Sequence, residues 1–354
     1  MYLAALQASD FRCFESLSLE LDPVANLIVG PNASGKTSLL EAVAMLGRGK
    51  SFRGVTAQHV VRHGTEQFTV HGRVRSAGVE HRLGVSNGRR GLEVRIDGDD
   101  QAGSAALAEL LPLQIVDPNV HELVAGGPEE RRRYLDWLLF HVEPNYLEAW
   151  RRFRRVLRQR NAALKDGPTP ATLSLWDKEL ASAGELVSEQ RNQVFDGAEP
   201  RLRSMAAELL GVAVEFELSR GWSGDMDLAD ALSVGRARDV ALGTTHSGPH
   251  RADIKLRYDK RLAKRLVSRG QQKLLACSMV LASAAVVRET LGRPLLLLLD
   301  DPAAELDDQS LGALLTAVRG LDCQVIATAL NADKTSLGDS VRLFHVKHGQ
   351  LSGA

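Results

Sequence analysis

The sequence predicts an α/β fold with an antiparallel β lobe and an inserted helical lobe, and three patterns lead to this prediction. An apolar run, Asn26–Val29, leads into a glycine-rich loop, and helical spacing follows over Thr37–Leu46. Residues Phe68–Ile96 alternate with period two, as expected of strands that expose one face. From Ala105 to Leu210, apolar residues recur at three- and four-residue intervals, which is typical of helices.

The β lobe is expected to consist of hairpins. Two short apolar runs at the N-terminus flank a polar turn, and the pairs Ala77-Gly78 and Asn87-Gly88 mark turns in the period-two region. Glycine and asparagine adopt the left-handed backbone conformations that tight hairpins need. The expected strands are Tyr2–Ser9, Ser16–Leu21, Phe68–Arg75, Val79–Val85 and Leu92–Ile96.

The stretch from Ala105 to Leu210 is expected to be helical throughout and to contain an antiparallel pair, because the break Asp166–Pro170 separates two long helices. We therefore expect residues 105–210 to form an inserted helical lobe, and residues 1–104 and 211–354 to form one head. The helices expected in the lobe are Glu129–Phe140, Tyr146–Lys165 and Leu173–Val194. Beyond it we expect strands Val212–Leu218, Ala252–Arg257, Leu295–Leu299 and Gln324–Ala327, helices Gln271–Thr290 and Ser310–Arg319, and a closing hairpin at His348-Gly349.

The composition is that of a soluble globular protein, with 44% hydrophobic and 25% charged residues. The 44 basic and 44 acidic residues balance, so a nucleic-acid partner would have to be held by a local basic patch. The three cysteines have no metal-ligand spacing, which indicates a reducing cytoplasm. The N-terminus does not resemble a signal peptide, and the longest purely apolar run, Leu295–Leu299, is too short to span a membrane.

Residues Gly30–Thr37 fit the phosphate-loop pattern G-x-x-x-x-G-K-[ST] without deviation. Glycines keep bulky side chains away, so that backbone N–H groups can surround phosphate oxygens at the start of a helix. Lys36 is expected to reach the β- and γ-phosphates, and the Thr37 hydroxyl to bind Mg²⁺. A chance match is the alternative, but a strand precedes the motif and a helix follows it, as the motif requires. The residues predicted to bind ATP here are Gly30, Pro31, Asn32, Ala33, Ser34, Gly35, Lys36, Thr37 and Ser38.

Two carboxylates, Asp300 and Asp301, end the apolar run Leu295–Leu299. The carboxyl ends of buried parallel strands form the usual ligand crevice of an open α/β sheet. Asp300 is expected to hold Mg²⁺, and Asp301 to act as the base that polarises the attacking water. Asp301 and Lys36 are thus the predicted catalytic residues. The alternative, that both acids only cap the strand, is disfavoured by the intact phosphate loop.

A second helix start precedes these carboxylates. Ser268, Gly270 and Gln271 form an S-x-G-Q pattern, in which Ser268 is a natural N-cap and the helix end offers a second anion site. A capped helix alone would also explain the pattern. A second phosphate site is useful in a dimer, where one protomer's helix end can close over the γ-phosphate bound by the other. Glu305-Leu306-Asp307 follows the carboxylates, and the family resemblance described next implies that Asp307 contacts the nucleotide as well.

In this order the phosphate loop, the signature Leu266–Gln272, the carboxylates and Glu305-Leu306-Asp307 resemble the motif set of ABC/SMC-type ATPase heads. Within that superfamily the chain most resembles the RecF family of bacterial recombination and replication repair proteins, and the matching residues span nearly the whole chain. These residues are Phe11-Arg12-Cys13-Phe14, Ser51-Phe52-Arg53, Gly127-Pro128, Arg131-Arg132, Leu135-Asp136, Gln159-Arg160-Asn161, Gly248-Pro249-His250-Arg251-Ala252-Asp253 and Asp300-Asp301.

The resemblance implies an ATPase, with ATP and Mg²⁺ as cofactors, that forms an ATP-dependent homodimer. It also implies binding to DNA at single-strand gaps or duplex/single-strand junctions, and work with RecR- and RecO-type mediators to load RecA during repair in the cytoplasm. Two departures from general ABC usage imply slow hydrolysis. Asp301 replaces the usual glutamate, and the switch histidine expected near Thr328-Ala329 is absent.

An arginine-rich segment between Ala149 and Lys165, which contains no acidic residue, is the candidate DNA contact. On a helix, Trp150, Phe153, Leu157 and Leu164 share one face, and the arginines that flank it can meet a phosphate backbone. The alternative is a solvated face whose arginines pair with nearby acids or contact a partner protein. The predicted DNA-binding residues are Arg151, Arg152, Arg154, Arg155 and Arg158, and the same basic run includes Arg160 and Lys165.

Other functions compete with an ATP-gated DNA clamp. The coupling subunit of a transporter needs a membrane partner, and the expected helical lobe is too basic and too long for that role. An ATPase–nuclease of the OLD type needs a Toprim domain, for which little sequence remains after Val346. An SMC-like complex without direct DNA binding, or a purely structural tether, would need a longer coiled-coil arm than residues 105–210 can supply.

Overall fold

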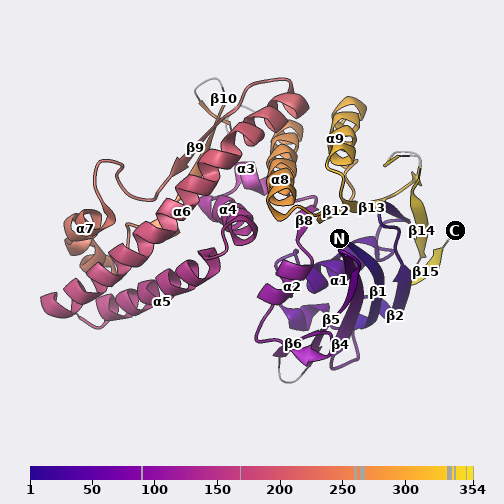
Figure 1. Ribbon diagram of the computed structural model, residues 1–354, viewed down its shortest axis with the longest axis horizontal. Coiled ribbons are helices and arrows are strands. Elements are labelled where there is room, and N and C mark those ends of the chain that lie inside the picture. Colours follow the sequence, from indigo (N-terminus) through magenta and orange to yellow (C-terminus); the bar gives the residue numbers. More distant parts are fainter. Residues whose placement is uncertain are drawn as a thin grey trace. The chain divides into compact units, whose positions relative to one another are not determined.

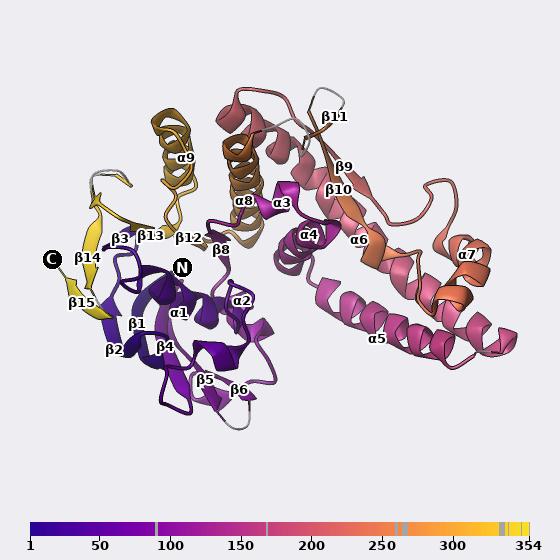
Figure 2. The same cartoon turned by 180° about the vertical axis from the view of Figure 1, so that it is seen from behind.

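The computed structural model describes residues 1–88, 91–167, 169–258, 261–263, 268–332, 337–338, 340–347 and 349–353. Residues 1–120 and 292–354 form one compact unit, and residues 121–291 form a second (Figures 1 and 2). This division differs from the expected lobe at 105–210. The difference arises because β8 (Leu113–Val116) pairs within the first unit, whereas α8 (Arg269–Leu291) packs on helices of the second.

A six-stranded sheet is the centre of the first unit, with strand order β15-β14-β3-β13-β12-β8. All neighbours pair in parallel except β14 and β15, which form the closing hairpin. Every residue of β3, β12 and β13 is buried, and all but Asn26, Gln324 and Thr328 are apolar, as expected of a parallel sheet covered on both faces. The bounds are β3 Ala25–Val29, β12 Leu296–Leu299, β13 Gln324–Ala329, β14 Arg342–Lys347 and β15 Gln350–Gly353. Of the predicted hairpin turn, His348 lies outside the described residues.

Residues 105–210 are not helical throughout, as the sequence pattern suggested. Leu113–Val116 is instead an edge strand, because Pro112 and Pro118 flank it and its backbone pairs with β12. Short helices precede and follow it: α2 spans Ala105–Leu110 and α3 spans Glu122–Ala125.

The second sheet of this unit is antiparallel, in the order β2-β1-β4-β5-β6-β7. The N-terminal hairpin and the turn at Ala77-Gly78 form as expected, but Asn87 and Gly88, predicted as turn residues, belong to the strand and pair with Leu92 and Gly91. Helix α1 packs on strands of both sheets and is almost entirely buried. The remaining bounds are β1 Tyr2–Phe11, β2 Phe14–Glu20, α1 Lys36–Arg48, η1 Ala57–Val60, β4 Phe68–Ser76, β5 Val79–Gly88, β6 Gly91–Ile96, β7 Asp99–Asp100 and α9 Asp308–Gly320.

The second unit is built around α6 (Pro170–Leu210), a helix of 41 residues. It packs antiparallel to α5 (Tyr146–Lys165) in its first half, where Arg152 of α5 pairs with Glu179, and on α8 in its second half, where Arg201 pairs with Glu289 (Figure 1). The helix runs past the expected end at Val194 and through Pro200. Buried side chains beyond the proline, such as Leu202 and Leu209, pack well enough to offset the hydrogen bond that a proline removes.

Other elements complete the second unit. Helix α7, which the sequence pattern did not predict, carries Gly235 in its middle and is fixed at its ends by the N-cap Asp227 and the left-handed Gly243. A three-stranded sheet has the order β11-β10-β9. The bounds are α4 Pro128–Val142, α5 Tyr146–Lys165, β9 Glu215–Ser219, α7 Leu228–Leu242, η2 Pro249–Arg251, β10 Asp253–Tyr258 and β11 Arg261–Leu262.

Helix α8 is the only helix among the described residues that is long and apolar enough to cross a membrane. Its most apolar window is 72% buried inside the protein, and the Tyr134 hydroxyl donates a hydrogen bond to the Met279 carbonyl oxygen in that buried face. It therefore has the properties of a core helix.

Candidate nucleotide site and DNA-binding face

The phosphate loop joins the end of β3 to the start of α1. A Cβ at Gly30 would lie 2.2 Å from the Val346 carbonyl oxygen, and one at Gly35 would lie 2.9 Å from the Cys13 sulfur atom. Gly35 also has a φ of 117°, which favours glycine. The backbone therefore shapes the loop, as phosphate binding by N–H groups requires. Between the glycines lie Pro31, Asn32, Ala33 and Ser34, and Thr37 and Ser38 follow Lys36 in the first turn of α1.

Lys36, the first residue of α1, turns its side chain back toward the loop. Its Nζ donates hydrogen bonds to the carbonyl oxygens of Gly30, at 2.7 Å, and Pro31, at 2.9 Å. Burial lowers the pKa of Lys36, and the charges of Asp301 and Asp300 act in the opposite direction. The structure thus brings the lysine and the two carboxylates together at the carboxyl end of the sheet.

Asp300 follows β12 and contacts hydroxyl groups from two other segments. The Thr37 Oγ1 lies 3.0 Å from each carboxylate oxygen, and the Thr328 Oγ1 of β13 donates to Oδ1 at 2.8 Å. Burial raises the pKa of Asp300, and the neighbouring charge of Asp301 acts in the same direction. A carboxylate beside a hydroxyl is the hard oxygen donor set that Mg²⁺ prefers. Thr37 and Asp300 therefore fit the predicted Mg²⁺ site.

Asp301 has a φ of 49°, an uncommon left-handed backbone conformation for a residue that carries a side chain. Its N–H donates a hydrogen bond to the Thr328 Oγ1 at 2.9 Å. Strained residues of this kind gather at functional sites, where the surrounding structure holds them in place.

Sequence reasoning did not place two charged residues near Asp300, although one of them, Arg53, belongs to the quoted Ser51-Phe52-Arg53 motif. Asp117 follows β8, next to β12, and burial together with the charge of Asp300 raises its pKa. Arg53 is the other, because its positive charge opposes the rise in the pKa of Asp300 that burial causes. An acid that directly follows Leu113–Val116, in which three of the four residues are apolar, was the available signal for Asp117.

The predicted signature residues lie in the second unit, at the start of α8. Ser268 and Gln271 form a capping box, in which the Gln271 N–H donates to the Ser268 Oγ at 3.3 Å and the Ser268 N–H donates to the Gln271 Oε1 at 2.9 Å. Both residues are exposed, and Gly270 lies between them in the first turn. The signature residues Leu266 and Val267 lie outside the described residues.

Asp307 lies in the first unit and begins α9. Its carboxylate accepts hydrogen bonds from the N–H of Ser310, at 2.8 Å, and from its hydroxyl, at 3.0 Å. These hydrogen bonds lower the pKa of Asp307. The exposed side chain is thus an N-cap in this structure, in addition to the nucleotide contact predicted for it.

Helix α5 separates its apolar and basic residues as the sequence predicts. Phe153, Leu157 and Leu164 are buried, whereas the five predicted DNA-binding arginines are exposed. Arg152 pairs with Glu179 at 2.9 Å, and the Arg154 guanidinium lies over the Trp150 ring. We call the exposed set the arginine face; it consists of Arg151, Arg152, Arg154, Arg155 and Arg158.

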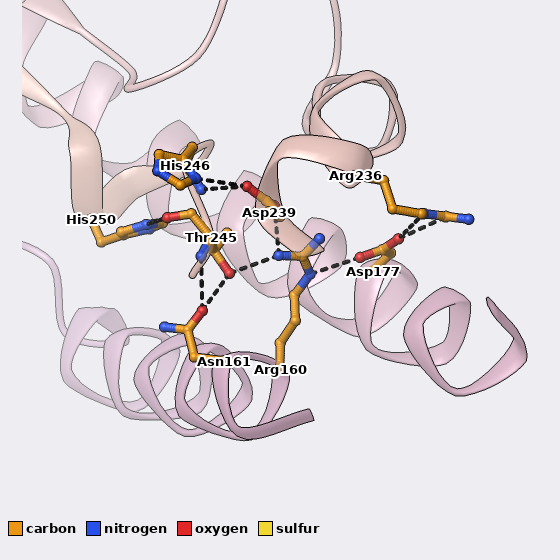
Figure 3. A network of polar contacts seen from close by, with 8 residues as sticks. All are labelled: Arg160, Asn161, Asp177, Arg236, Asp239, Thr245, His246 and His250. Carbon is orange, nitrogen blue, oxygen red and sulfur yellow. Dashed lines mark hydrogen bonds and ion pairs between the residues drawn. The ribbon is translucent and has the colours of Figure 1, made fainter. Parts of the chain in front are cut away.

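Arg160, which belongs to the same basic run, is not part of the arginine face. Its side chain is fully buried and donates to Asp177 at 2.7 Å, to Asp239 at 2.8 Å and to the Thr245 hydroxyl at 2.7 Å (Figure 3). These partners come from α6, α7 and the following loop. Arg160 therefore joins three segments of the second unit instead of meeting solvent.

The segment Gly248–Asp253 packs in the same region. The His250 Nε2–H donates a hydrogen bond to the Thr245 carbonyl oxygen at 3.0 Å (Figure 3), and burial lowers the pKa of His250 to about 4. Arg131 of α4 pairs with Asp253 at 2.7 Å. The segment therefore contacts α4 through Asp253 and α6 through the Pro249 carbonyl oxygen, which accepts a hydrogen bond from Arg191 at 2.8 Å, while Arg251 remains exposed.

The sequence matches the family described as RecF/RecN/SMC N terminal domain over residues 2–352. The DNA replication and repair protein RecF of Yersinia enterocolitica is 39% identical over 355 residues, which cover 99% of this chain and 98% of that protein. The RecF of Erwinia tasmaniensis is 38% identical over 356 residues and 99% of both chains. The chain belongs to the RecF family.

Solved structures agree with this assignment. A structure of the recombination mediator protein RecF with ATP, in the RecFOR pathway, is 26% identical and has a TM-score of 0.90 over 100% of this chain and 97% of that chain. An Smc head bound to the C-winged helix domain of ScpA has a TM-score of 0.61 at 13% identity, which shows the fold alone. The predicted resemblance to RecF and the α/β fold of an ABC/SMC-type ATPase head are thereby confirmed.

Proposed function

We propose that this RecF-family chain is an ATP-dependent DNA-binding protein of recombinational repair and replication restart. The observation that carries the proposal is the exposed arginine face on α5, which lies in the same unit as the signature helix α8. An ATP-driven dimer of heads clamps DNA at single-strand gaps and helps to load recombinase. RecR- and RecO-type mediators are the expected partners, and the RecFOR pathway named for a solved relative supports them.

The ATPase site is assigned as follows. The phosphate loop and Lys36 hold the phosphates, Thr37 and Asp300 hold Mg²⁺, and Asp301 orients the attacking water. Mg²⁺ held by these two residues would supply positive charge that stabilises the phosphates. Hydrolysis is slow because an aspartate stands in the usual glutamate position, and it acts as a cytoplasmic timer that releases DNA.

The exposed Ser268 end of α8 is assigned to the partner protomer's nucleotide. Ser268→Arg is expected to leave ATP binding by the isolated chain intact and to abolish ATP-driven dimerisation, because a bulky cation then occupies the surface that must approach the partner. Light scattering after gel filtration, with and without ATP, measures this. Thr169→Arg, at the exposed N-cap of α6, is the matched control and is expected to dimerise normally. Loss of ATP binding in Ser268→Arg would contradict the assignment.

DNA binding is tested by fluorescence anisotropy on gapped, duplex and single-stranded DNA, with ATP, with ADP and without nucleotide. We expect binding to require ATP and to fall steeply with salt. Arg154→Ala, Arg155→Ala and Arg158→Ala should each weaken binding and lower the salt slope by about 1. Arg133→Ala is the control, since that exposed arginine is already paired with Glu129 and Glu130. DNA binding that is indifferent to ATP, or absent on every DNA, would overturn the clamp and leave only an ATPase.

A further inference from the structure

Thr328 occupies an unusual place beside the two carboxylates. It lies near the end of β13 and is fully buried. Its hydroxyl donates to the Asp300 Oδ1 at 2.8 Å and accepts from the Asp301 N–H at 2.9 Å. One hydroxyl thus holds the side chain of the first acid and the backbone of the second.

The sheet puts the hydroxyl in this position. Strand β13 pairs in parallel with β12, and Ala327 lies opposite Leu299, the last residue of β12. The next residue along each segment is Thr328 in β13 and Asp300 after β12, so these two residues lie side by side. On its other edge β13 pairs with β3, with Thr328 opposite Ile28, just before the phosphate loop. The contact therefore belongs to the rigid centre of the sheet.

The hydroxyl of Thr37 also contacts Asp300, but it differs from the hydroxyl of Thr328 in one respect. Thr37 is itself an expected ligand of Mg²⁺, so its hydroxyl has to serve the metal as well as the carboxylate. Thr328 has no such second task, because its donor is used on Asp300 and it accepts from Asp301. It is the contact that can orient the carboxylate whether or not the metal is bound.

The backbone of Asp301 gives the contact further importance. A residue with a φ of 49° keeps that conformation only when its surroundings hold it. Among the described residues, the Thr328 hydroxyl is the partner of the Asp301 N–H. Loss of this hydrogen bond would free the Asp301 peptide to rotate, which would redirect its carboxylate.

We propose that Thr328 is a positioning residue for ATP hydrolysis, which orients Asp300 toward Mg²⁺ and holds Asp301 in the conformation that faces the attacking water. The proposal rests on the roles assigned above to Asp300 and Asp301. Thr328 thus acts at the end of β13, near the position where the switch histidine of ABC ATPases is expected and is absent in this chain.

The test compares Thr328→Val, which keeps the shape and removes the hydroxyl, with Thr328→Ser, which keeps the hydroxyl. We expect Thr328→Val to lower kcat by about tenfold to a hundredfold, since it removes a hydrogen bond to a charged group. The Mg²⁺-dependent gain in ATP affinity should shrink, while ATP affinity in EDTA, which depends on the phosphate loop, should stay unchanged. Thr328→Ser should restore kcat to within about threefold, because the hydroxyl can make the same bonds.

Affinity for a fluorescent ATP analogue and thermal unfolding are measured beside the ATPase rate, so that a folding defect is separated from a loss of positioning. If Thr328→Val does not fold, Thr328→Ser and Thr328→Ala are compared in the same assays. A kcat within twofold of the wild type without the hydroxyl, or a serine variant as slow as valine, would overturn the proposal. If the wild type hydrolyses ATP without binding DNA, the proposed DNA clamp is overturned, but the comparison of the Thr328 variants still tests the role of Thr328 in hydrolysis.

Discussion

Arg160→Met is expected to lower the free energy of unfolding by about 3–5 kcal/mol, the usual cost of removing one partner from a buried ion pair. The side chain of Arg160 is fully buried, and its partners Asp177 and Asp239 are almost as inaccessible to water. Arg236 still pairs with Asp177 in the variant, but the Asp239 oxygen that faces Arg160 is left without its guanidinium. Urea unfolding followed by circular dichroism measures the change.

Arg158→Met is the matched control for this prediction, because it removes the same group from an exposed position two residues earlier on α5. We expect its stability to stay within about 0.5 kcal/mol of the wild type, as is usual for surface substitutions. DNA binding should show the opposite order. At temperatures at which both variants are folded, Arg158→Met should bind DNA more weakly than the wild type, whereas Arg160→Met should not. Equal stability of the two variants would show that the buried network does not hold the helices together.

Lys36→Met is expected to abolish ATP binding in the working concentration range. Truncation of a desolvated charge that meets an opposite charge costs about 2–5 kcal/mol, which corresponds to about a thirtyfold to several-thousandfold loss of affinity. The methionine keeps the bulk of the side chain while the ammonium that now bonds to Gly30 and Pro31 is lost. Isothermal titration calorimetry with ATP and Mg²⁺ measures the loss.

The control is Lys347→Met, which removes an exposed lysine from β14 of the same unit. It should bind ATP like the wild type and retain ATP-dependent DNA binding, whereas Lys36→Met should lose both. ATP affinity within threefold of the wild type in Lys36→Met would show that the loop does not bind the triphosphate through this lysine.

The phosphate loop and the Asp300-Asp301 pair could be predicted because each is a contiguous pattern next to an element with a clear period. The sequence could not show that Thr328 joins these carboxylates, since the contact depends on the pairing of β13 with β12. It also could not show the conformation of Asp301, because a positive φ at a residue other than glycine is imposed by the surroundings.

The contacts of the arginine-rich helix α5 also could not be predicted from the sequence pattern. Spacing on α5 separated buried from exposed faces, but it did not distinguish Arg160 from the exposed arginines beside it. That distinction depends on acids 17 and 79 residues away in the chain, which reach the guanidinium only in the folded protein. The strand β8 was missed for a related reason: a strand of four residues is too short to show a period of its own, and its partner strand is distant in sequence.

Helix α6 has a mechanical consequence for the second unit. Its 41 residues, at a rise of 1.5 Å each, make a rod about 60 Å long. Helix α5, which carries the arginine face, packs on the first half of α6, and helix α8, which carries the signature, packs on the second half. A tilt of one degree at one end moves the other by about 1 Å, which is enough to make or break a hydrogen bond. A tilt of α6 would therefore move α5 and α8 as well, because both helices pack on it.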